Sequence, residues 1–165
     1  MKLTDTNIAL RPIAPKDIPF LMEVYASTRE AEMERVSFWT DLMKKEFLAS
    51  QFKAQHDYYH KNYIGANFWI IEFENKMIGR LYLDKNFQGK GMRIIDISIL
   101  PRYRNLGLGQ GIFKDLMSWA AELNAPLSIH VEAFNPARNL YLRLGFKLIS
   151  ETNGVYHLME WRHTI

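Results

Sequence analysis

The chain has 165 residues, 48% of them hydrophobic and 13% aromatic, so it is long enough to bury one core and we expect one domain over residues 1–165. The formal net charge is only +3 and the basic residues are scattered, which argues against a dedicated nucleic-acid binder. The absence of cysteine excludes disulfides, thiolate metal sites and a cysteine acyl-enzyme.

The N-terminal residues lack the apolar region of a signal peptide, and no apolar run approaches the roughly 20 residues that cross a bilayer. We therefore expect a cytoplasmic protein with neither a membrane nor a nucleic-acid partner.

Hydrophobic periodicity predicts a strand, two helices and a hairpin in the first half of the chain. The expected elements are a strand over 7–12, a helix beginning at 15–17, a long helix over 39–63, and strands over 68–73 and 77–83 joined by the turn 74–76. The expected apolar faces are Ile18, Leu21, Met22 and Tyr25 on the first helix, and Leu42, Met43, Phe47, Phe52 and Tyr59 on the second. Gly79 is expected to mark a bulge in the second hairpin strand.

The second half of the chain predicts alternating strands and helices. The expected elements are a strand over 92–100, a helix over 108–123, a strand over 127–131, a short helix over 135–144, and closing strands over 146–149 and 155–161 around a turn at 153–154. This order predicts an α/β (α+β) fold in which helices cover both faces of a mixed sheet.

A glycine-rich turn opens the helix that begins near Leu108. The first turn of a helix has amide N–H groups without internal partners and carries the positive end of the helix dipole, so it suits an anion. Because Gly107 and Gly109 have no Cβ, a diphosphate can approach the amides of residues 106–111, beside the charges of Arg102 and Arg104.

Two common nucleotide motifs do not fit this turn. The third glycine of G-x-G-x-x-G would fall on Ile112, and no Gly-Lys-Ser/Thr follows as a Walker motif requires. The alternative is that Gly107, Gly109 and Gly111 only permit a tight turn and close helix packing.

A second segment, residues 131–146, contains a short helix with typical boundary residues. Asn135 suits the N-cap, Pro136 the first helical position, and Gly145 the position after the last turn. Tyr141 therefore lies on this helix. Without a motif, Asn135 would be read as a cap and Tyr141 as a packed aromatic.

The two segments together resemble the GNAT superfamily of acyl-CoA N-acyltransferases. The resemblance rests on R-x-x-G-x-G from Arg104 to Gly109, on Asn135, and on L-Y-x-x-x-G-F from Leu140 to Phe146. It implies a mostly antiparallel sheet in which two parallel strands, here 92–100 and 127–131, splay apart to hold the pantetheine arm of acetyl-CoA.

The resemblance also implies a set of cofactor-binding residues. Backbone groups near Ile99 and Leu100 would bond the pantetheine amides, Asn135 would bond the same arm, and the Tyr141 hydroxyl would lie near the sulfur. The full set is Ile99, Leu100, Arg102, Arg104, Asn105, Leu106, Gly107, Leu108, Gly109, Gln110, Gly111, Asn135 and Tyr141.

Acyl transfer to an amine needs an acid, a base and a donor for the developing oxyanion. We expect Tyr141 to be the acid, and the resemblance points to a backbone amide near Leu100 for the oxyanion. The base stays open. Asp96 and His130 lie on the polar faces of neighbouring strands and are possible partners, Glu72 is a third candidate, and a water relay needs no side chain.

The acceptor pocket is expected to come from the N-terminal helices, the hairpin and the closing strands. The foremost candidates are Arg29, Glu32, Trp39 and Tyr156, followed by Glu34, Gln51, Gln55 and Tyr58. His56 and His60 are one helical turn apart but have no third ligand in view, so we expect no metal site.

Three functions stay open at this point. The first is acetyl transfer from acetyl-CoA to a primary amine on a small molecule or peptide, in a ternary complex and with a homodimer as a possible assembly. The second is acetylation of protein N-termini or side chains, and the third is an acyl-CoA sensor without turnover.

Overall fold

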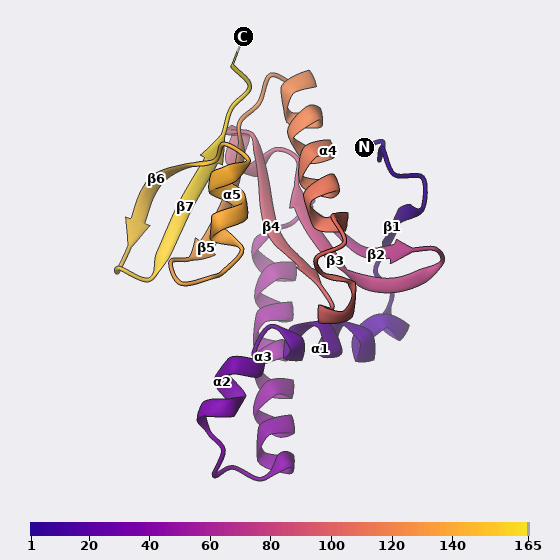
Figure 1. The fold of residues 1–165 in the computed structure, drawn as a ribbon, viewed down its shortest axis with the longest axis vertical. Coiled ribbons are helices and arrows are strands. Elements are labelled where there is room, and N and C mark those ends of the chain that lie inside the picture. The colour runs from indigo at the N-terminus through magenta and orange to yellow at the C-terminus, as the bar shows by residue number, and fades with distance from the viewer. Residues whose placement is uncertain (165) are drawn as a thin grey trace.

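The computed structural model describes residues 1–164, and Figure 1 shows their arrangement. The strands are β1 (Ile8–Pro12), β2 (Asn67–Phe73), β3 (Lys76–Asp84), β4 (Met92–Ile99), β5 (Leu127–Glu132), β6 (Lys147–Thr152) and β7 (Tyr156–Trp161). The α-helices are α1 (Ile18–Ser27), α2 (Glu30–Arg35), α3 (Asp41–Asn62), α4 (Leu108–Glu122) and α5 (Arg138–Arg143).

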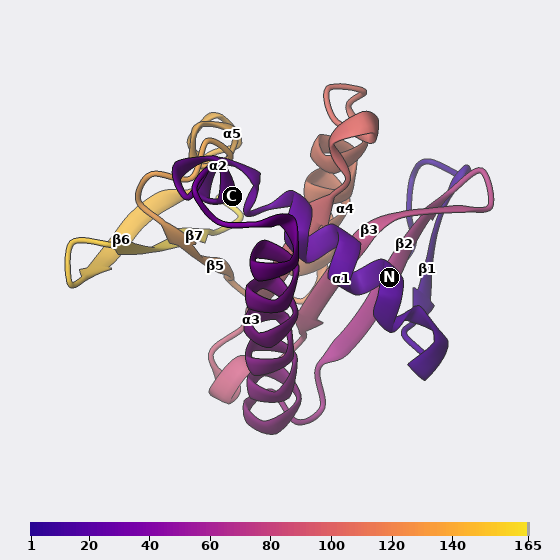
Figure 2. The ribbon, with the colours of Figure 1, turned by 90° about the horizontal axis from the view of Figure 1, so that it is seen from below.

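The seven strands form one sheet in the order β1-β2-β3-β4-β5-β7-β6, and only the β4–β5 pair is parallel. Figure 2 shows α4 and α5 on one face of this sheet and α1 and α3 on the other. Each face has its own buried cluster. The larger contains Ile112, Phe113 and Tyr141 against the sheet, and the smaller contains Tyr25 and Phe52. The α/β fold expected from the sequence is confirmed.

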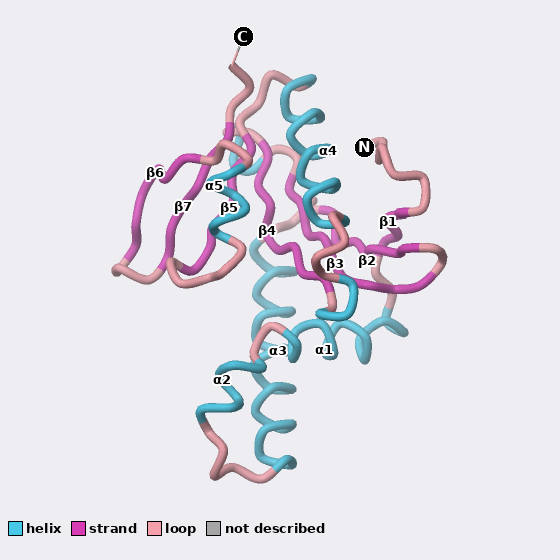
Figure 3. Tube along the Cα trace, viewed as in Figure 1, coloured by secondary structure: helices cyan, strands magenta, loops and turns pink. Residues whose placement is uncertain are grey.

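The parallel pair separates soon after it begins. Its register runs only from Met92↔Leu127 to Ile94↔Ile129, although β4 continues to Ile99. Tyr82 of β3 pairs with Asp96 and Leu83 pairs with Ile94, so Ile95 is an extra residue in β4. A bulge bends its strand and increases the local twist, which accounts for β4 turning away from β5 (Figure 3).

Gly79 of β3 lies against the backbone of β4 at Ser98. A Cβ at this position would be 2.1 Å from the Ser98 carbonyl oxygen, so no other residue fits. The bulge of this strand falls on the preceding residue, Ile78, because Ile71 pairs with Gly79 and Glu72 with Met77.

The expected long helix is α3, which begins at Asp41 after Thr40, whose hydroxyl accepts from the Met43 N–H. The short helix α2 before it was not predicted, and two other expectations, the apolar face of α3 and the length of α5, were wrong. The first half of the expected apolar face of α3 is exposed at Leu42, Met43 and Phe47, and only Phe52 is fully buried. This half of α3 extends beyond the sheet (Figure 1), so the sheet does not cover it.

Helix α5 is shorter than expected, since Asn135 is not its N-cap. The Asn135 Oδ1 accepts from the Ala137 N–H at 2.9 Å, and the helix begins at Arg138 after a turn. Among residues 1–164, no helix combines the length and apolar character needed to cross a bilayer.

Candidate active site

The turn before α4 presents a run of free backbone donors. Within residues 1–164, the amides of residues 105–110 donate to no protein group, whereas the Gly111 N–H bonds the Gly107 carbonyl at 3.0 Å. Asn105 and Gly107 have positive φ angles of 61° and 79°, which turn the chain sharply into the helix. Such a concave run of N–H groups at the positive end of a 15-residue helix favours an anion.

The bend of β4 leaves a second set of free backbone groups. The Leu100 N–H bonds the Ile78 carbonyl at 2.8 Å, toward β3. Because the bonding direction alternates along an antiparallel strand, the backbone groups of Ile97 and Ile99 point to the other side, where β5 has departed. The Leu100 N–H itself is therefore unavailable to an oxyanion, and the open amides near Leu100 belong to Ile97 and Ile99.

Arg104 joins these two sets. Its Nε donates to the Ile99 carbonyl at 2.7 Å, so the guanidinium lies at the open edge of β4, and its backbone directly precedes the free amides. Arg102 instead lies over the Tyr103 ring and is 3.5 Å from Glu23. The space beside Gly109 is open, since a Cβ there would meet only the Ile99 Cδ1, at 3.5 Å.

Tyr141 projects from α5 into the larger core. Its ring packs on Phe113 and Phe146, with centroids 5.1 Å and 6.0 Å away. Its hydroxyl makes no hydrogen bond within residues 1–164. Burial raises the pKa of Tyr141, and the negative charge of Asp96 raises it further. The hydroxyl is therefore protonated at neutral pH and free to donate.

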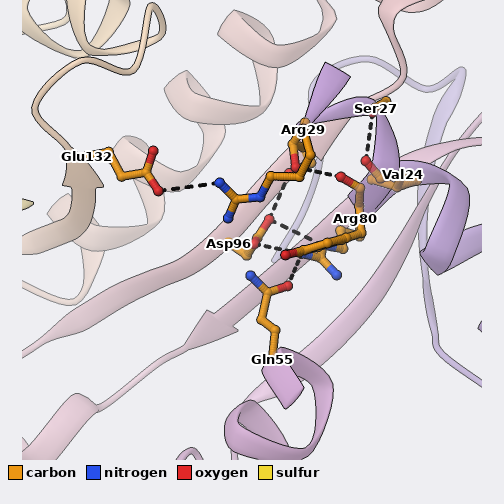
Figure 4. A network of polar contacts seen from close by, with 10 residues as sticks. Val24, Ser27, Arg29, Gln55, Arg80, Asp96 and Glu132 are labelled. Carbon is orange, nitrogen blue, oxygen red and sulfur yellow. Dashed lines mark hydrogen bonds and ion pairs between the residues drawn. The ribbon is translucent and has the colours of Figure 1, made fainter. Parts of the chain in front are cut away.

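Asp96 is held by a buried cation, as Figure 4 shows. Its carboxylate accepts from Arg80 Nη2 at 2.8 Å and Nε at 3.3 Å, and from the Ser98 hydroxyl at 2.8 Å. Gln55 Oε1 accepts from Arg80 Nη2 at 2.7 Å. Both oxygens of this carboxylate are therefore already hydrogen-bonded within the protein. Sequence reasoning missed Arg80, although a charge within an otherwise apolar strand was the available signal.

His130 lies at the fork between the two parallel strands. It follows Ile129, the last residue of β5 that pairs with β4, and its ring is 5.3 Å from the Tyr156 ring. No hydrogen bond or ion pair joins it to Asp96, whose carboxylate is bonded by Arg80 and Ser98, so the two residues are not direct partners. Partial burial lowers the pKa of His130, and the charge of Arg93 lowers it further, so the imidazole is neutral at neutral pH.

Arg29 reaches from the junction of α1 and α2 toward the end of β5. Its Nη1 donates to Glu32 Oε1 at 2.8 Å and lies 3.6 Å from Glu132 Oε1 (Figure 4). Glu132 was not among the predicted site residues. Ser128, His130 and Glu132 alternate with apolar residues along β5, and this shared polar face was the available signal for Glu132.

The remaining candidates lie apart from the fork. Glu72 is 3.7 Å from Arg11 at the far side of the sheet, and Trp39 packs on Phe47. Gln51 and Tyr58 are exposed on α3. Glu34 lines a cleft of about 640 Å3 between the three N-terminal helices and residues 100–102.

Comparison with known proteins identifies the family. The model described as the acetyltransferase (GNAT) family matches residues 30–146, more than half of the chain. The chain belongs to this family.

The relatives of this GNAT protein include enzymes with several acceptors. It is 26% identical over 144 residues to a Bacillus subtilis (strain 168) protein named "Putative ribosomal protein bS18-alanine N-acetyltransferase", covering 86% of this chain and 82% of that one. The PaiA N-acetyltransferase of Thermoplasma acidophilum, solved with coenzyme A, has a TM-score of 0.66 at 14% identity, covering 94% and 99% of the two chains. The spermidine N-acetyltransferase of Vibrio cholerae, solved with CoA and spermine, has a TM-score of 0.63 at 18% identity, covering 96% of each.

As a GNAT enzyme the protein is an acyl-CoA-dependent N-acetyltransferase, and its cofactor is acetyl-CoA. The residues present fit that cofactor. The free amides of residues 105–110 suit its diphosphate, the open edge of β4 at Ile97 and Ile99 suits an amide-containing arm, and Tyr141 offers an unbonded hydroxyl.

Proposed function

We propose that the residues around the fork carry out direct acetyl transfer to the α-amino group of a polypeptide. When bound, acetyl-CoA supplies an acetyl group activated as a thioester. The amides of residues 105–110 and the Arg104 guanidinium hold the diphosphate, and the open backbone groups of Ile97 and Ile99 align the arm.

Two side chains at the fork handle protons in this proposal. Tyr141 holds a proton on its hydroxyl and donates it to the leaving group, which its raised pKa supports. His130 is the proton acceptor, directly or through a water, because it is neutral and uncommitted while Asp96 is held by Arg80. Asp96 is then a structural residue that fixes β3 against β4.

The weakness of the available base supports an α-amine as acceptor. A lysine-like amine has a reference pKa of about 10.4 and is almost fully protonated at pH 7, whereas an α-amine at about 7.7–8.0 has a substantial neutral fraction. A single exposed histidine can therefore accept the proton of an α-amine far more readily than that of a lysine-like amine. The printed name of the Bacillus subtilis relative, an alanine N-acetyltransferase, agrees with this choice.

A polyamine is the second candidate, favoured by the three carboxylates of Glu23, Glu30 and Glu34 along the cleft beside residues 100–102. Against it, that cleft also contains Arg102 and Lys44, and the fork itself is flanked by the positive charges of Arg29 and Arg80. A second ammonium group would be repelled there.

The observation that carries the proposal is the unbonded hydroxyl of Tyr141 together with a neutral histidine at the fork between β4 and β5. The test is acetyl-CoA consumption with three acceptors: a short peptide with a free N-terminus, the same peptide with a blocked N-terminus and an internal lysine, and spermidine. The proposal expects the free N-terminus to have the highest kcat/KM. Tight acetyl-CoA binding with no turnover of any acceptor would instead favour the sensor.

A single domain, a cytoplasmic location, the lack of a nucleic-acid partner and a homodimeric assembly stay predictions from the sequence. Size-exclusion chromatography with light scattering would test the last of these.

A further inference from the structure

The pair formed by Arg29 and Glu132 spans the opening of the fork on the α3 face of the sheet. Arg29 follows α1, and Glu132 is the last residue of β5, so the two side chains come from elements far apart in the sequence. Figure 4 shows them pointing toward one another, with the Asp96–Arg80 pair beneath. Their side chains are 25% and 26% exposed, so a ligand can reach both.

The hydrogen-bonding capacity of this pair is largely unused. Arg29 Nη1 and Glu132 Oε1 are 3.6 Å apart, beyond the range of a hydrogen bond between them. Within residues 1–164, the Glu132 carboxylate accepts no hydrogen bond and the Arg29 side chain donates only one, to Glu32. The Arg29 Nε is buried and has no partner. Leaving a buried donor unpaired is costly, so such groups call for an explanation.

We propose that Arg29 and Glu132 together bind the first residue of the acceptor polypeptide. Glu132 accepts a hydrogen bond from the α-amino group, and the Arg29 guanidinium donates through its accessible Nη2 to the carbonyl oxygen of the first peptide unit. This inference rests on the proposed α-amine acceptor and names the groups that recognise it. Both are positioning residues, since neither exchanges a proton with the reacting atoms.

The pair matches the chemistry of a chain N-terminus, in which a nitrogen and a carbonyl oxygen are separated by a single Cα. An alkyl amine has the nitrogen but no oxygen for Arg29. A lysine side chain carries its amine four methylenes from the backbone, so its carbonyl cannot reach the same place. A polyamine places a second cation near the Arg29 guanidinium, which is unfavourable.

The experiment compares two acceptors on four proteins. The acceptors are a short peptide with a free N-terminus and a primary alkyl amine of matched length without the first carbonyl. The proteins are the wild type, Arg29→Gln, Glu132→Gln and the control Arg35→Gln, an exposed arginine on α2 with no contact to the fork. KM and kcat are measured for each combination, with near-UV circular dichroism to establish folding.

Arg29→Gln is expected to raise KM for the peptide about tenfold or more, as the loss of a charged hydrogen bond implies, with little change in kcat. KM for the alkyl amine should stay the same or fall. Glu132→Gln should raise KM for both acceptors, since both contain the amine, and Arg35→Gln should change neither.

Equal losses for both acceptors in Arg29→Gln would overturn the inference, because they would indicate a purely structural role. If Arg29→Gln does not fold, Arg29→Lys replaces it: this variant keeps the charge but loses the Nη2 donor of the planar guanidinium, and it should show the same selective loss. A wild type that acetylates alkyl amines or polyamines but no peptide N-terminus would refute the proposed function itself, and the inference with it.

Discussion

Arg80 and Asp96 form an ion pair between β3 and β4, with 2.8 Å between Nη2 and Oδ2 and only 2% of the arginine side chain exposed. The pair lies directly beneath the fork. Alternation along β4 makes the Asp96 carboxylate a candidate base, but this carboxylate is already bound by Arg80. The structural role of Asp96 in the ion pair and its predicted role as a catalytic base can be separated by mutation.

Asp96→Asn should destabilise the protein by about 3–5 kcal/mol, because it leaves the buried guanidinium without its counter-charge. Urea denaturation measures the change. The double variant Arg80→Met/Asp96→Leu, which removes both charges, should recover much of the loss. An Asp96→Asn protein of unchanged stability with little remaining activity would show instead that Asp96 is the catalytic base.

Tyr141→Phe tests the acid. Removing the hydroxyl should lower kcat about 10²–10⁴-fold, the usual contribution of a general acid, while acetyl-CoA affinity stays nearly constant. Rapid-quench or steady-state kinetics together with calorimetric CoA binding separate these effects. Phe113→Leu, which alters the ring packed against Tyr141 but leaves the hydroxyl, is the matched control. An unchanged kcat in Tyr141→Phe would exclude Tyr141 as the acid.

Two glycines of the turn before α4 should respond differently to alanine. Gly107 has a φ of 79°, which costs an L-residue roughly 1–2 kcal/mol, so Gly107→Ala should lower stability. Gly109 is helical and open, so Gly109→Ala should leave thermal stability unchanged or improved and weaken CoA binding, since the methyl group would lie where the diphosphate approaches. Wild-type CoA affinity in Gly109→Ala would contradict this placement.

The pH dependence of the rate should follow His130. Since burial and then Arg93 lower its pKa below the usual value of about 6.5, His130 is neutral at pH 7 and becomes protonated only at more acidic pH. The value of kcat, which reports groups in the enzyme–substrate complex and not the ionisation of the free α-amine, should therefore fall as the pH drops below about 6.5, and His130→Gln should have a lower kcat without this acidic limb. Because the pKa of His130 is lower in the folded protein than in the unfolded chain, the unfolded chain binds the proton more readily. The free energy of unfolding therefore also falls with decreasing pH and must be measured in parallel. An acidic limb that survives in His130→Gln would point to another base.

Much of the fold follows from local sequence signals. The strands 68–73 and 77–83 were predicted to within a residue because Glu74 and Asn75 provide a turn with two positive φ angles. The turn before α4 was predicted for the same kind of reason, since its glycines and the position of the helix are local features.

The parts that the sequence did not predict depend on tertiary register. The bulge at Ile95 decides whether Leu100 or its neighbours point into the fork, and no property of Ile95 marks it among the adjacent isoleucines. Asp96 is an unsuitable base because the alignment of β3 and β4 places Arg80 beside it, where the guanidinium binds its carboxylate. The sequence does not reveal that alignment. The exposure of Leu42 could not be predicted either, because hydrophobic periodicity shows that apolar residues share one face of a helix but not whether another element covers that face.

The most direct test of the whole account is a backbone amide NMR titration of the protein with CoA. We expect the largest shift changes at the amides of residues 105–110, followed by Ile97 and Ile99, and little change at Leu100, whose N–H is bonded to Ile78. Changes confined to the separate basic cleft around Lys85, Lys90 and Arg162, with residues 105–110 unaffected, would contradict it.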